Sequence, residues 1–305
     1  MISGMGENNA LQSEQHIEKG SVSPSKTPKS LPYSVLMSVY FKEKPTYLST
    51  ALTSMIKQTS QPEQIVLVED GPLPKELNNV IESFNTRYPN LFTVVALPQN
   101  EGLGNALAKG MLLCRNEIVA RMDSDDYAFP DRMAKELDAL TQHDLDFVGS
   151  QIVEFMGNPR TPIAQSTLPL SQRDIEAYSK RRNPFRHPSM VFRKSAVLEV
   201  GNYRADYLYF EDWDLFNRMI AAGYRTANVN EPLVAMRVSQ NFYARRGGIR
   251  YIRHIWKFNV AQLKSGYFTF PQFIETTIPR IIVCCMPNSL RSFVYTKLLR
   301  KGVYQ

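Results

Sequence analysis

The stretch Arg121-Met122-Asp123-Ser124-Asp125-Asp126-Tyr127 is the most informative in this chain, and it directly follows the apolar run Ile118-Val119-Ala120. The apolar run is typical of a buried strand, so the three carboxylates would project from its C-terminal end. Open α/β sheets bind their ligands at that end of the strands. Carboxylates this close repel one another unless a proton or a cation relieves the repulsion. The stretch therefore indicates a site for a hard divalent ion and phosphate oxygens, with a helix-capping acidic loop as the alternative.

The segment before this stretch alternates short β-rich runs with helix-length amphipathic runs. The alternation predicts right-handed βαβ units and a parallel sheet. The strands are almost continuously apolar, which favours burial on both faces. The predicted strands cover residues 33–40, 64–69, 92–97 and 118–120, and the predicted helices 46–58, 75–88 and 102–114.

The alternation breaks after the acidic stretch. A helix is expected at 131–142 and a strand at 147–155, followed by a proline-rich connection, a strand at 188–193, a helix at 213–222 and a strand at 226–237. This half is expected to be mixed in direction and to complete the same sheet. The predicted fold class is α/β, with one mixed, mostly parallel sheet flanked by helices over residues 32–240.

The two ends of the chain differ from this central domain. Residues 1–31 are rich in Ser, Asn, Gln, Glu and Lys, which predicts a disordered leader without the basic start and apolar core of a secretory signal. Helices are expected at 251–264, 271–285 and 289–300, in an amphipathic extension over residues 241–305. The apolar run at 281–286 is too short to span a bilayer. The three cysteines have no metal-binding or redox spacing, which favours the cytoplasm.

The net charge of +7 is concentrated at the C-terminal end. Residues 242–305 contain 11 Lys or Arg and a single acid, Glu275. Such a segment indicates a polyanionic partner, although it can also simply solvate terminal helices. We expect the anionic inner face of the cell membrane rather than nucleic acid, and therefore a peripheral membrane location.

Polar groups follow three predicted strands, and the C-terminal ends of parallel strands share one edge of the sheet. The first strand ends in Tyr40-Phe41-Lys42-Glu43, the second in Glu69-Asp70-Gly71, and the fourth in the aspartate stretch. A single acid in such a place is commonly a turn residue. Gly102 can bring backbone N–H groups near a phosphate or can form a simple tight turn. A second acidic stretch, Glu211-Asp212-Trp213-Asp214, opens a helix, where acids also serve as caps.

In this order, these motifs resemble family 2 glycosyltransferases, which are inverting enzymes with the GT-A fold. The resemblance runs from about residue 32 to 237, and its details are similar to the branch that assembles exopolysaccharides such as amylovoran. The motifs that carry it are Ser34-Val35-Leu36-Met37-Ser38-Val39-Tyr40, Val66-Leu67-Val68-Glu69-Asp70-Gly71, Asn100-Glu101-Gly102-Leu103-Gly104, Met122-Asp123-Ser124-Asp125-Asp126 and Glu211-Asp212-Trp213-Asp214-Leu215.

The resemblance implies a role for each acid. Asp70 is expected to bind the nucleobase and Asp125 the ribose. Asp126, with Asp125 or Asp123, is expected to hold Mg²⁺ or Mn²⁺ at the diphosphate. Asp212 is expected to be the general base, and its place at a helix N-terminus favours the anion at neutral pH.

The remaining residues expected at the substrates come from four other segments. Tyr40 and Glu43 would line the nucleotide pocket, and Gly102 and Glu211 would lie beside the substrates. His187 would lie near the donor phosphates or the acceptor, or else be a loop histidine satisfied by the backbone.

The implied function is transfer of a sugar from a nucleotide-diphosphate donor, expected to be a UDP-sugar, to a hydroxyl of a lipid-linked glycan. The product would be a bacterial exopolysaccharide or another surface polysaccharide, such as capsule or O-antigen. One alternative is a sugar nucleotidyltransferase of similar fold, although the segment after the first strand lacks the glycine-rich basic loop expected there. The other is a non-catalytic protein that binds sugar nucleotides or polyanions.

Overall fold

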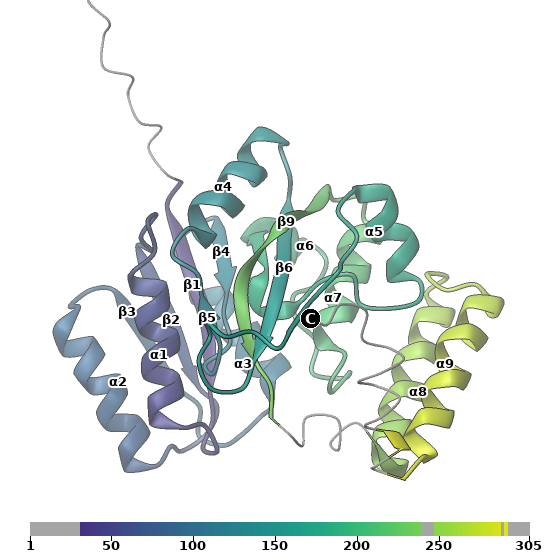
Figure 1. The fold of residues 1–305 in the computed structure, drawn as a ribbon, viewed down its shortest axis with the longest axis horizontal. Helices are drawn as coiled ribbons and strands as arrows, with labels where there is room; N and C mark the ends of the chain where they lie inside the picture. The colour runs from purple at the N-terminus through teal and green to yellow at the C-terminus, as the bar shows by residue number, and fades with distance from the viewer. Residues whose placement is uncertain (1–30, 240–246, 288–289, 292–305) are drawn as a thin grey trace, which may run out of the picture.

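The computed structural model describes residues 31–239, 247–287 and 290–291. Within these residues the chain forms a nine-stranded sheet in the order β3-β2-β1-β4-β8-β6-β9-β5, with β7 paired to β6 (Figure 1). Helices cover both faces of the sheet, and two further helices lie at one end of the molecule. The predicted leader lies almost entirely outside the described residues.

The first half of the sheet is parallel, as predicted. Its strands β3, β2, β1 and β4 pair in that order, all in the same direction. The runs in β1, β2 and β4 are almost wholly buried, as their continuous apolar character indicated. The bounds are Tyr33–Val39 for β1, Gln64–Glu69 for β2, Phe92–Ala96 for β3 and Ile118–Arg121 for β4.

The second half is mixed, also as predicted, because β8 reverses the direction. β8 pairs antiparallel with both β4 and β6, and β9 then pairs parallel with β6 and antiparallel with β5. The bounds are Tyr127–Ala128 for β5, Phe147–Phe155 for β6, Ala164–Gln165 for β7, Val191–Arg193 for β8 and Thr226–Arg237 for β9.

Sequence patterns missed several short elements in this half. The strand predicted at 188–193 covers only Val191–Arg193, because His187–Ser189 form a 3₁₀ turn. The proline-rich connection contains β7 and the helix α5 (Gln172–Ser179), and the short helix α6 (Lys194–Glu199) follows β8. Two- and three-residue strands show no periodicity, so only their pairing reveals them.

The helices divide between the two faces of the sheet because side chains along each strand alternate in direction. In β1, Val35 and Met37 face one core cluster and Leu36 the other. The first cluster also contains side chains of α1 (Pro45–Ile56), α2 (Lys75–Arg87) and α4 (Arg132–Gln142). The second contains side chains of α3 (Leu103–Leu113), α5, α6 and α7 (Glu211–Ala221).

Gly110 allows α3 to lie directly on the sheet. A Cβ atom at this position would lie 2.5 Å from a methyl carbon of Leu36 and 2.8 Å from one of Val68. The α3 helix therefore packs closely over β1 and β2, which fixes the loop at its N-terminus above the ends of these strands.

The last two described helices form a pair that packs against the start of α7. These are α8 (Gly248–Lys264) and α9 (Phe270–Cys285), which lie side by side at one end of the molecule (Figure 1). Their contact with α7 is a separate aromatic cluster that includes Phe210, Trp213 and Phe258. The third predicted helix, 289–300, lies outside the described residues except for positions 290 and 291.

Candidate functional site

The three aspartates that follow β4 come together at the C-terminal end of the parallel strands. One carboxylate oxygen from each of Asp123, Asp125 and Asp126 lies within 4.8 Å of those of the other two. Asp126 is 1% exposed, and its buried Oδ2 atom has no hydrogen-bond partner within the part of the chain that the structure describes, whereas Asp123 and Asp125 keep some exposure. An unpartnered buried carboxylate oxygen is costly. The cluster therefore fits a cation, since three acidic oxygens converge and one of them lacks a partner.

The protonation of these acids reflects their crowding. Removal from water, together with the neighbouring Asp123 and Glu43 carboxylates, raises the pKa of Asp125 to about 7. Burial and the charges of Asp125 and Asp123 likewise raise the pKa of Asp126 well above its usual value. A bound cation would reverse both effects, because it favours the ionised carboxylates.

Two contacts hold the aspartate loop in place. Ser124 Oγ donates to Glu43 Oε2 at 2.8 Å, which joins this loop to the one after β1, where Tyr40 is 38% exposed. On the other side, Arg237 at the end of β9 donates its backbone N–H to Asp126 Oδ1 at 2.6 Å and its Nε–H to the Asp125 carbonyl at 2.9 Å. Of the predicted nucleotide-pocket residues, Glu43 is thus brought directly to the aspartates.

Asp70 binds the neighbouring loop in this structure. Its Oδ1 accepts the backbone N–H of Glu101 at 2.7 Å, and its Oδ2 accepts that of Gly102 at 3.1 Å and the Asn100 side-chain amide at 3.0 Å. Gly71 permits this close approach, because a Cβ there would lie 2.6 Å from the Asn100 nitrogen and its φ is +87°. Asp70 therefore shapes the loop before α3, and the Gly102 N–H points at Asp70. Contact of either residue with a nucleotide stays a prediction.

The second acidic stretch begins α7, two residues earlier than predicted. Asp212 Oδ1 accepts the backbone N–H of Trp213 at 2.7 Å, and its Oδ2 accepts the Asn183 side-chain amide at 2.7 Å. Burial nevertheless raises the pKa of Asp212, outweighing these bonds, which act in the opposite direction. Burial and the Asp212 charge also raise the pKa of Glu211 to about 7. A raised pKa moves a carboxylate toward the neutral pH at which a general base works best.

Aromatic packing fixes the start of this helix. The Phe258 ring of α8 lies 4.9 Å, between centroids, from both Phe210 and Trp213. Trp213 Nε1 also donates to the Ser179 carbonyl of α5 at 3.1 Å. The C-terminal helices therefore help to position Asp212.

Arg121 connects the two acidic sites, and the sequence analysis assigned it no role. It is 1% exposed, its guanidinium pairs with Asp123, and its buried Nε and Nη1 atoms have no hydrogen-bond partner among the described residues. Its positive charge also acts to lower the pKa of Asp126, Glu211 and Asp212. The sequence did indicate such a role, because Arg121 ends a predicted buried strand and a buried guanidinium requires anionic partners.

His187 belongs to the same buried region. Its Nε2 lies 2.8 Å from the Tyr203 hydroxyl. Burial, and to a smaller extent the positive charge of Arg121, lowers the pKa of His187 well below its usual value. A neutral imidazole donates a hydrogen bond through one ring nitrogen and accepts one through the other, and it carries no charge. The side chain is therefore satisfied by a tyrosine rather than by the backbone, and its contact with substrate stays a prediction.

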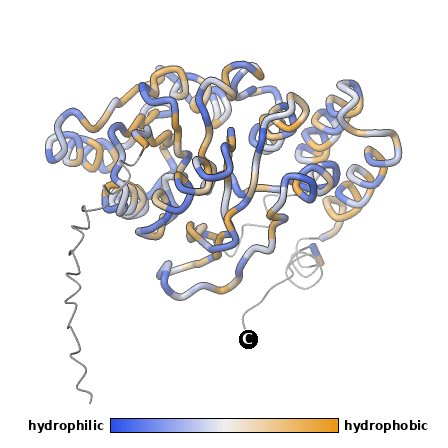
Figure 2. The backbone as a smooth tube through the Cα atoms, turned by 90° about the horizontal axis from the view of Figure 1, so that it is seen from above, coloured by the Kyte–Doolittle hydropathy of each residue, from blue (hydrophilic) through white to orange (hydrophobic). Residues whose placement is uncertain are grey.

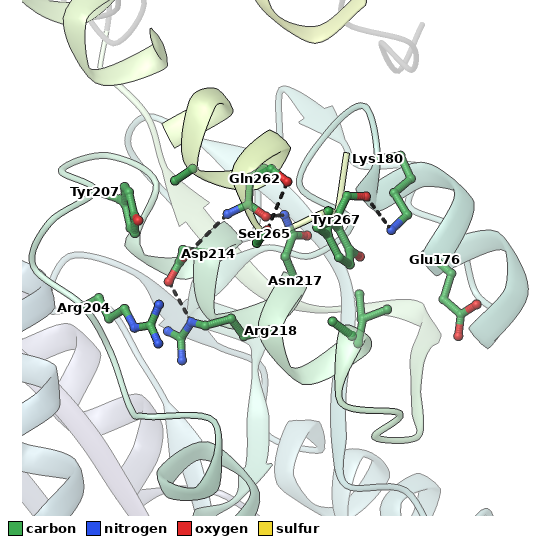
Figure 3. Close-up of a pocket in the computed structure, with 14 residues that line it drawn as sticks. Glu176, Lys180, Arg204, Tyr207, Asp214, Asn217, Arg218, Gln262, Ser265 and Tyr267 are labelled. Atoms are coloured by element: carbon green, nitrogen blue, oxygen red, sulfur yellow. Dashed lines mark hydrogen bonds and ion pairs between the residues drawn. The ribbon is translucent and has the colours of Figure 1, made fainter. Parts of the chain in front are cut away.

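Asp214 faces different surroundings from Asp212. It pairs with Arg218 at 2.8 Å and accepts from Gln262 of α8 at 3.3 Å. These residues line a cavity of about 510 Å³ where α5, α7 and α8 meet (Figure 3). None of Asp123, Asp125, Asp126 or Asp212 lines that cavity. We therefore assign Asp214 to the packing of α7 against α8, apart from the acidic site.

Comparison with known proteins identifies the family of this chain. The family model described as glycosyl transferase family 2 matches residues 34–201. The chain is 38% identical over 278 residues to an Escherichia coli UDP-Gal:alpha-D-GlcNAc-diphosphoundecaprenol beta-1,3-galactosyltransferase, covering 90% of this chain and 98% of that protein. It is 35% identical over 277 residues to the amylovoran biosynthesis glycosyltransferase AmsE of Erwinia amylovora, covering 88% of this chain and 100% of that protein.

Solved structures show the same fold at lower identity. The mannosyltransferase PcManGT from Pyrobaculum calidifontis, in complex with GDP-Man and Mn²⁺, has a TM-score of 0.59 at 16% identity, covering 87% of this chain and 73% of that one. Staphylococcus aureus TarS in complex with UDP has a TM-score of 0.57 at 15% identity, covering 88% of this chain and 71% of that one. The GT-A-like α/β fold predicted from the sequence is thus confirmed, and the family match over more than half of the chain, with two relatives above 30% identity, shows that this chain belongs to glycosyl transferase family 2 and is a glycosyltransferase.

Proposed function

We propose that this glycosyltransferase moves a sugar from a UDP-sugar to a hydroxyl of a lipid-diphosphate-linked glycan, with inversion at the anomeric carbon. One observation carries the proposal: the buried Arg121 pairs with Asp123 of the aspartate cluster, and its positive charge also acts on Asp212 at the start of α7. Such a pair of acidic sites suits a reaction that needs a cation at the leaving group and a base at the nucleophile. The nature of both substrates is inferred from the name of the E. coli relative.

The donor diphosphate would lie at the aspartate cluster. Asp126 and Asp125, with Asp123 beside them, would hold Mg²⁺ or Mn²⁺, which supplies positive charge that offsets the negative charge developing on the leaving diphosphate. The rest of the nucleotide would lie toward the ends of β1 and β2. Glu43, held by Ser124, is placed to define the wall of that pocket.

Asp212 would accept the proton of the acceptor hydroxyl. Asn183 and the Trp213 N–H fix both of its oxygens, so the carboxylate is oriented before substrate arrives. As the hydroxyl oxygen forms its bond to the anomeric carbon, the proton passes to Asp212 and the bond to the diphosphate breaks. Attack from the face opposite the leaving group gives the inverted product.

The basic C-terminal segment would bring the enzyme to its lipid-linked acceptor. Each Lys or Arg close to an anionic leaflet contributes about 1 kcal/mol of attraction, which salt screens. Deletion from Arg245 onward would be a poor test of this role. It removes α8, whose Phe258 packs on Trp213 beside Asp212, so it would disturb the site as well as the surface.

The direct test is a transfer assay with the full chain, Mn²⁺, a panel of UDP-sugars and a synthetic acceptor that has one sugar on a lipid diphosphate. We expect one donor to give a disaccharide with inverted configuration, detected by mass spectrometry and NMR. Product formation that is unchanged in the Asp212→Asn variant would contradict the assigned base. Absence of transfer from every nucleotide sugar, with donor binding intact, would favour a non-catalytic binding protein.

A further inference from the structure

One face of α9 exposes a continuous row of large apolar side chains. Phe270 is 65% exposed, Ile274 39%, Ile278 43% and Ile282 54%. These four positions are spaced four residues apart, so they form one stripe along the helix. We refer to these four side chains as the α9 stripe.

The α9 stripe lies beside the buried face of the same helix, and Phe270 at its start stacks on Phe273 of that face at 6.4 Å between ring centroids. Phe273, Thr276, Thr277 and Cys284 make up the buried face, which packs toward α8. The helix therefore has a packed side and a second apolar side that stays partly exposed in the described part of the chain. Contiguous apolar patches of this kind mark interaction surfaces.

The neighbouring helix adds an aromatic ring and positive charge to this surface. Trp256 of α8 is 51% exposed, and its ring meets that of Phe273 edge-to-face at 5.6 Å. Arg250 and Arg253 are exposed on α8 as well, and so is Lys257, which lies 3.6 Å from Asp206. Figure 2 shows hydrophobic and hydrophilic residues interleaved along this helix pair. Tryptophan beside apolar side chains, with basic residues at the flank, is the composition of a helix that lies in a lipid–water interface.

We propose that α9 lies in the plane of the membrane, with Phe270, Ile274, Ile278 and Ile282 inserted among the lipid acyl chains at an anionic leaflet. Among the described residues, no helix is both long enough and apolar enough to cross a bilayer. The stripe extends over about 18 Å of helix, at 1.5 Å per residue, which suits a helix that lies flat. The inference deepens the proposed function, because it adds a salt-resistant apolar anchor to the electrostatic attraction.

Charge favours a lipid surface over a second copy of this chain. The acid on α9, Glu275, already pairs with Arg181 of the region before β8. A symmetric dimer through the α9 stripe would bring the basic side chains of two α8 helices together, and like charges oppose such an interface. An anionic leaflet instead attracts the exposed basic side chains of α8.

The location of the helix pair links the membrane to the chemistry. Because Phe258 of α8 packs on Phe210 and Trp213, an α9 helix seated in the leaflet holds the start of α7 near the surface. A lipid-linked acceptor would then present its sugar to Asp212 without leaving the bilayer. This step depends on the proposed acceptor, whereas insertion of the stripe does not.

The test measures binding of the full chain to vesicles by flotation. One set contains phosphatidylcholine alone, and the other contains phosphatidylcholine with phosphatidylglycerol. The test variant combines Ile274→Ser, Ile278→Ser and Ile282→Ser. The matched control combines Leu112→Ser, Leu113→Ser and Ile163→Ser, which are exposed apolar residues elsewhere on the surface. Thermal unfolding checks that both variants fold like the wild type.

We expect the wild type and the control to stay bound to anionic vesicles at about 1 M salt, where charge attraction is screened. The α9 variant should bind at low salt, but its partition coefficient at high salt should fall roughly 30-fold, because three side chains lose their apolar contact with lipid. Unchanged binding of the variant at high salt would overturn the inference. So would a wild type that binds neither vesicle set.

If a second copy of this chain, rather than a membrane, covers the α9 stripe, the experiment gives a different result. The wild type would then be a dimer in lipid-free buffer, the α9 variant a monomer, and vesicle binding the same for both, which would also overturn the inference. Transfer to an acceptor with a short, water-soluble lipid chain separates this question from the proposed function. If the α9 variant keeps that activity, a failed vesicle test leaves the transferase function intact.

Discussion

The guanidinium of Arg121 pairs with Asp123 while it is almost completely buried, at 1% exposure. Asp123 belongs to the aspartate cluster, and the same positive charge also acts on Asp212 and Glu211 across the site. A buried charge of this kind costs free energy of desolvation, which its anionic neighbours offset. We therefore propose that Arg121 is a positioning residue that couples the candidate cation site to the candidate base.

The first prediction concerns Arg121→Met. Loss of the charge should reduce kcat/KM about 10²-fold, similar to removal of one preorganised electrostatic contact. It should also move the acid limb of the pH profile to higher pH, because the Arg121 charge acts to lower the pKa of Asp212. Steady-state kinetics over a pH range measures both effects.

Two further variants define what would contradict this role. Arg121→Lys retains the charge and should keep the pH profile close to that of the wild type, although lysine lacks the planar guanidinium group of arginine. Arg87→Met, on the exposed side of α2, should change neither quantity. If Arg121→Met loses activity with an unshifted pH profile, the residue is merely structural.

The second prediction concerns Asp212→Asn. The amide cannot accept the hydroxyl proton, so kcat should fall roughly 10²–10⁴-fold while donor affinity changes little. The matched control is Asp214→Asn, on the same helix, where the carboxylate pairs with Arg218 and contacts α8. This control should lower the free energy of unfolding by about 1–3 kcal/mol and leave kcat within a few-fold. If Asp214→Asn lowered kcat strongly while Asp212→Asn lowered only the free energy of unfolding, Asp214 rather than Asp212 would be the base.

The parallel half of the fold could be predicted from sequence because its signal is local. Strands β1 and β2 are continuous apolar runs separated by an amphipathic helix, and this pattern alone predicts their direction and burial. The helix α5 was missed in a proline-rich connection. Its Ser171 cap accepts the Asp174 N–H, a spacing that the sequence does show.

The arrangement of the site was only partly predictable. The shared edge of β1, β2 and β4 follows from parallel pairing, so the approach of Glu43 to the aspartates could be expected. The contact of Asn183 with Asp212 joins residues that no periodicity relates. The hydrogen bond from the Glu101 N–H to Asp70 depends on the close approach of the Gly71 backbone to the Asn100 backbone, which only coordinates reveal.

The third prediction concerns metal-dependent donor binding. Asp126→Ala removes the buried carboxylate whose Oδ2 has no partner, and the cation would lose its most enclosed ligand. Calorimetric titration of UDP-sugar in the presence of Mn²⁺ should show at least a 10²-fold loss of affinity, because the diphosphate is bound through the cation. Asp131→Ala, an exposed residue five positions later, should bind like the wild type. Equal donor affinity in the two variants would remove Asp126 from the metal site.

The fourth prediction is that the metal-free protein becomes less stable as the pH rises from about 4.5 to 7. Asp125 and Glu211 have pKa values of about 7 in the folded protein, above their ordinary values of 3.8 and 4.5. Within this window the folded state binds more protons than the unfolded state, so unfolding becomes easier with increasing pH. The midpoint of thermal unfolding should fall by roughly 5 °C across it.

Added Mn²⁺ should reverse this loss, because a cation binds the ionised carboxylates and competes with protons. The rise in the unfolding midpoint on addition of Mn²⁺ should therefore be large near pH 8 and small near about pH 5. Asp125→Asn should reduce the metal-free pH dependence to the part that Glu211 causes and should also weaken the response to Mn²⁺, since the Asp125 carboxylate contributes to both. A variant that flattens the pH dependence but responds fully to Mn²⁺ would show that Asp125 titrates beside the cation site without contributing to it.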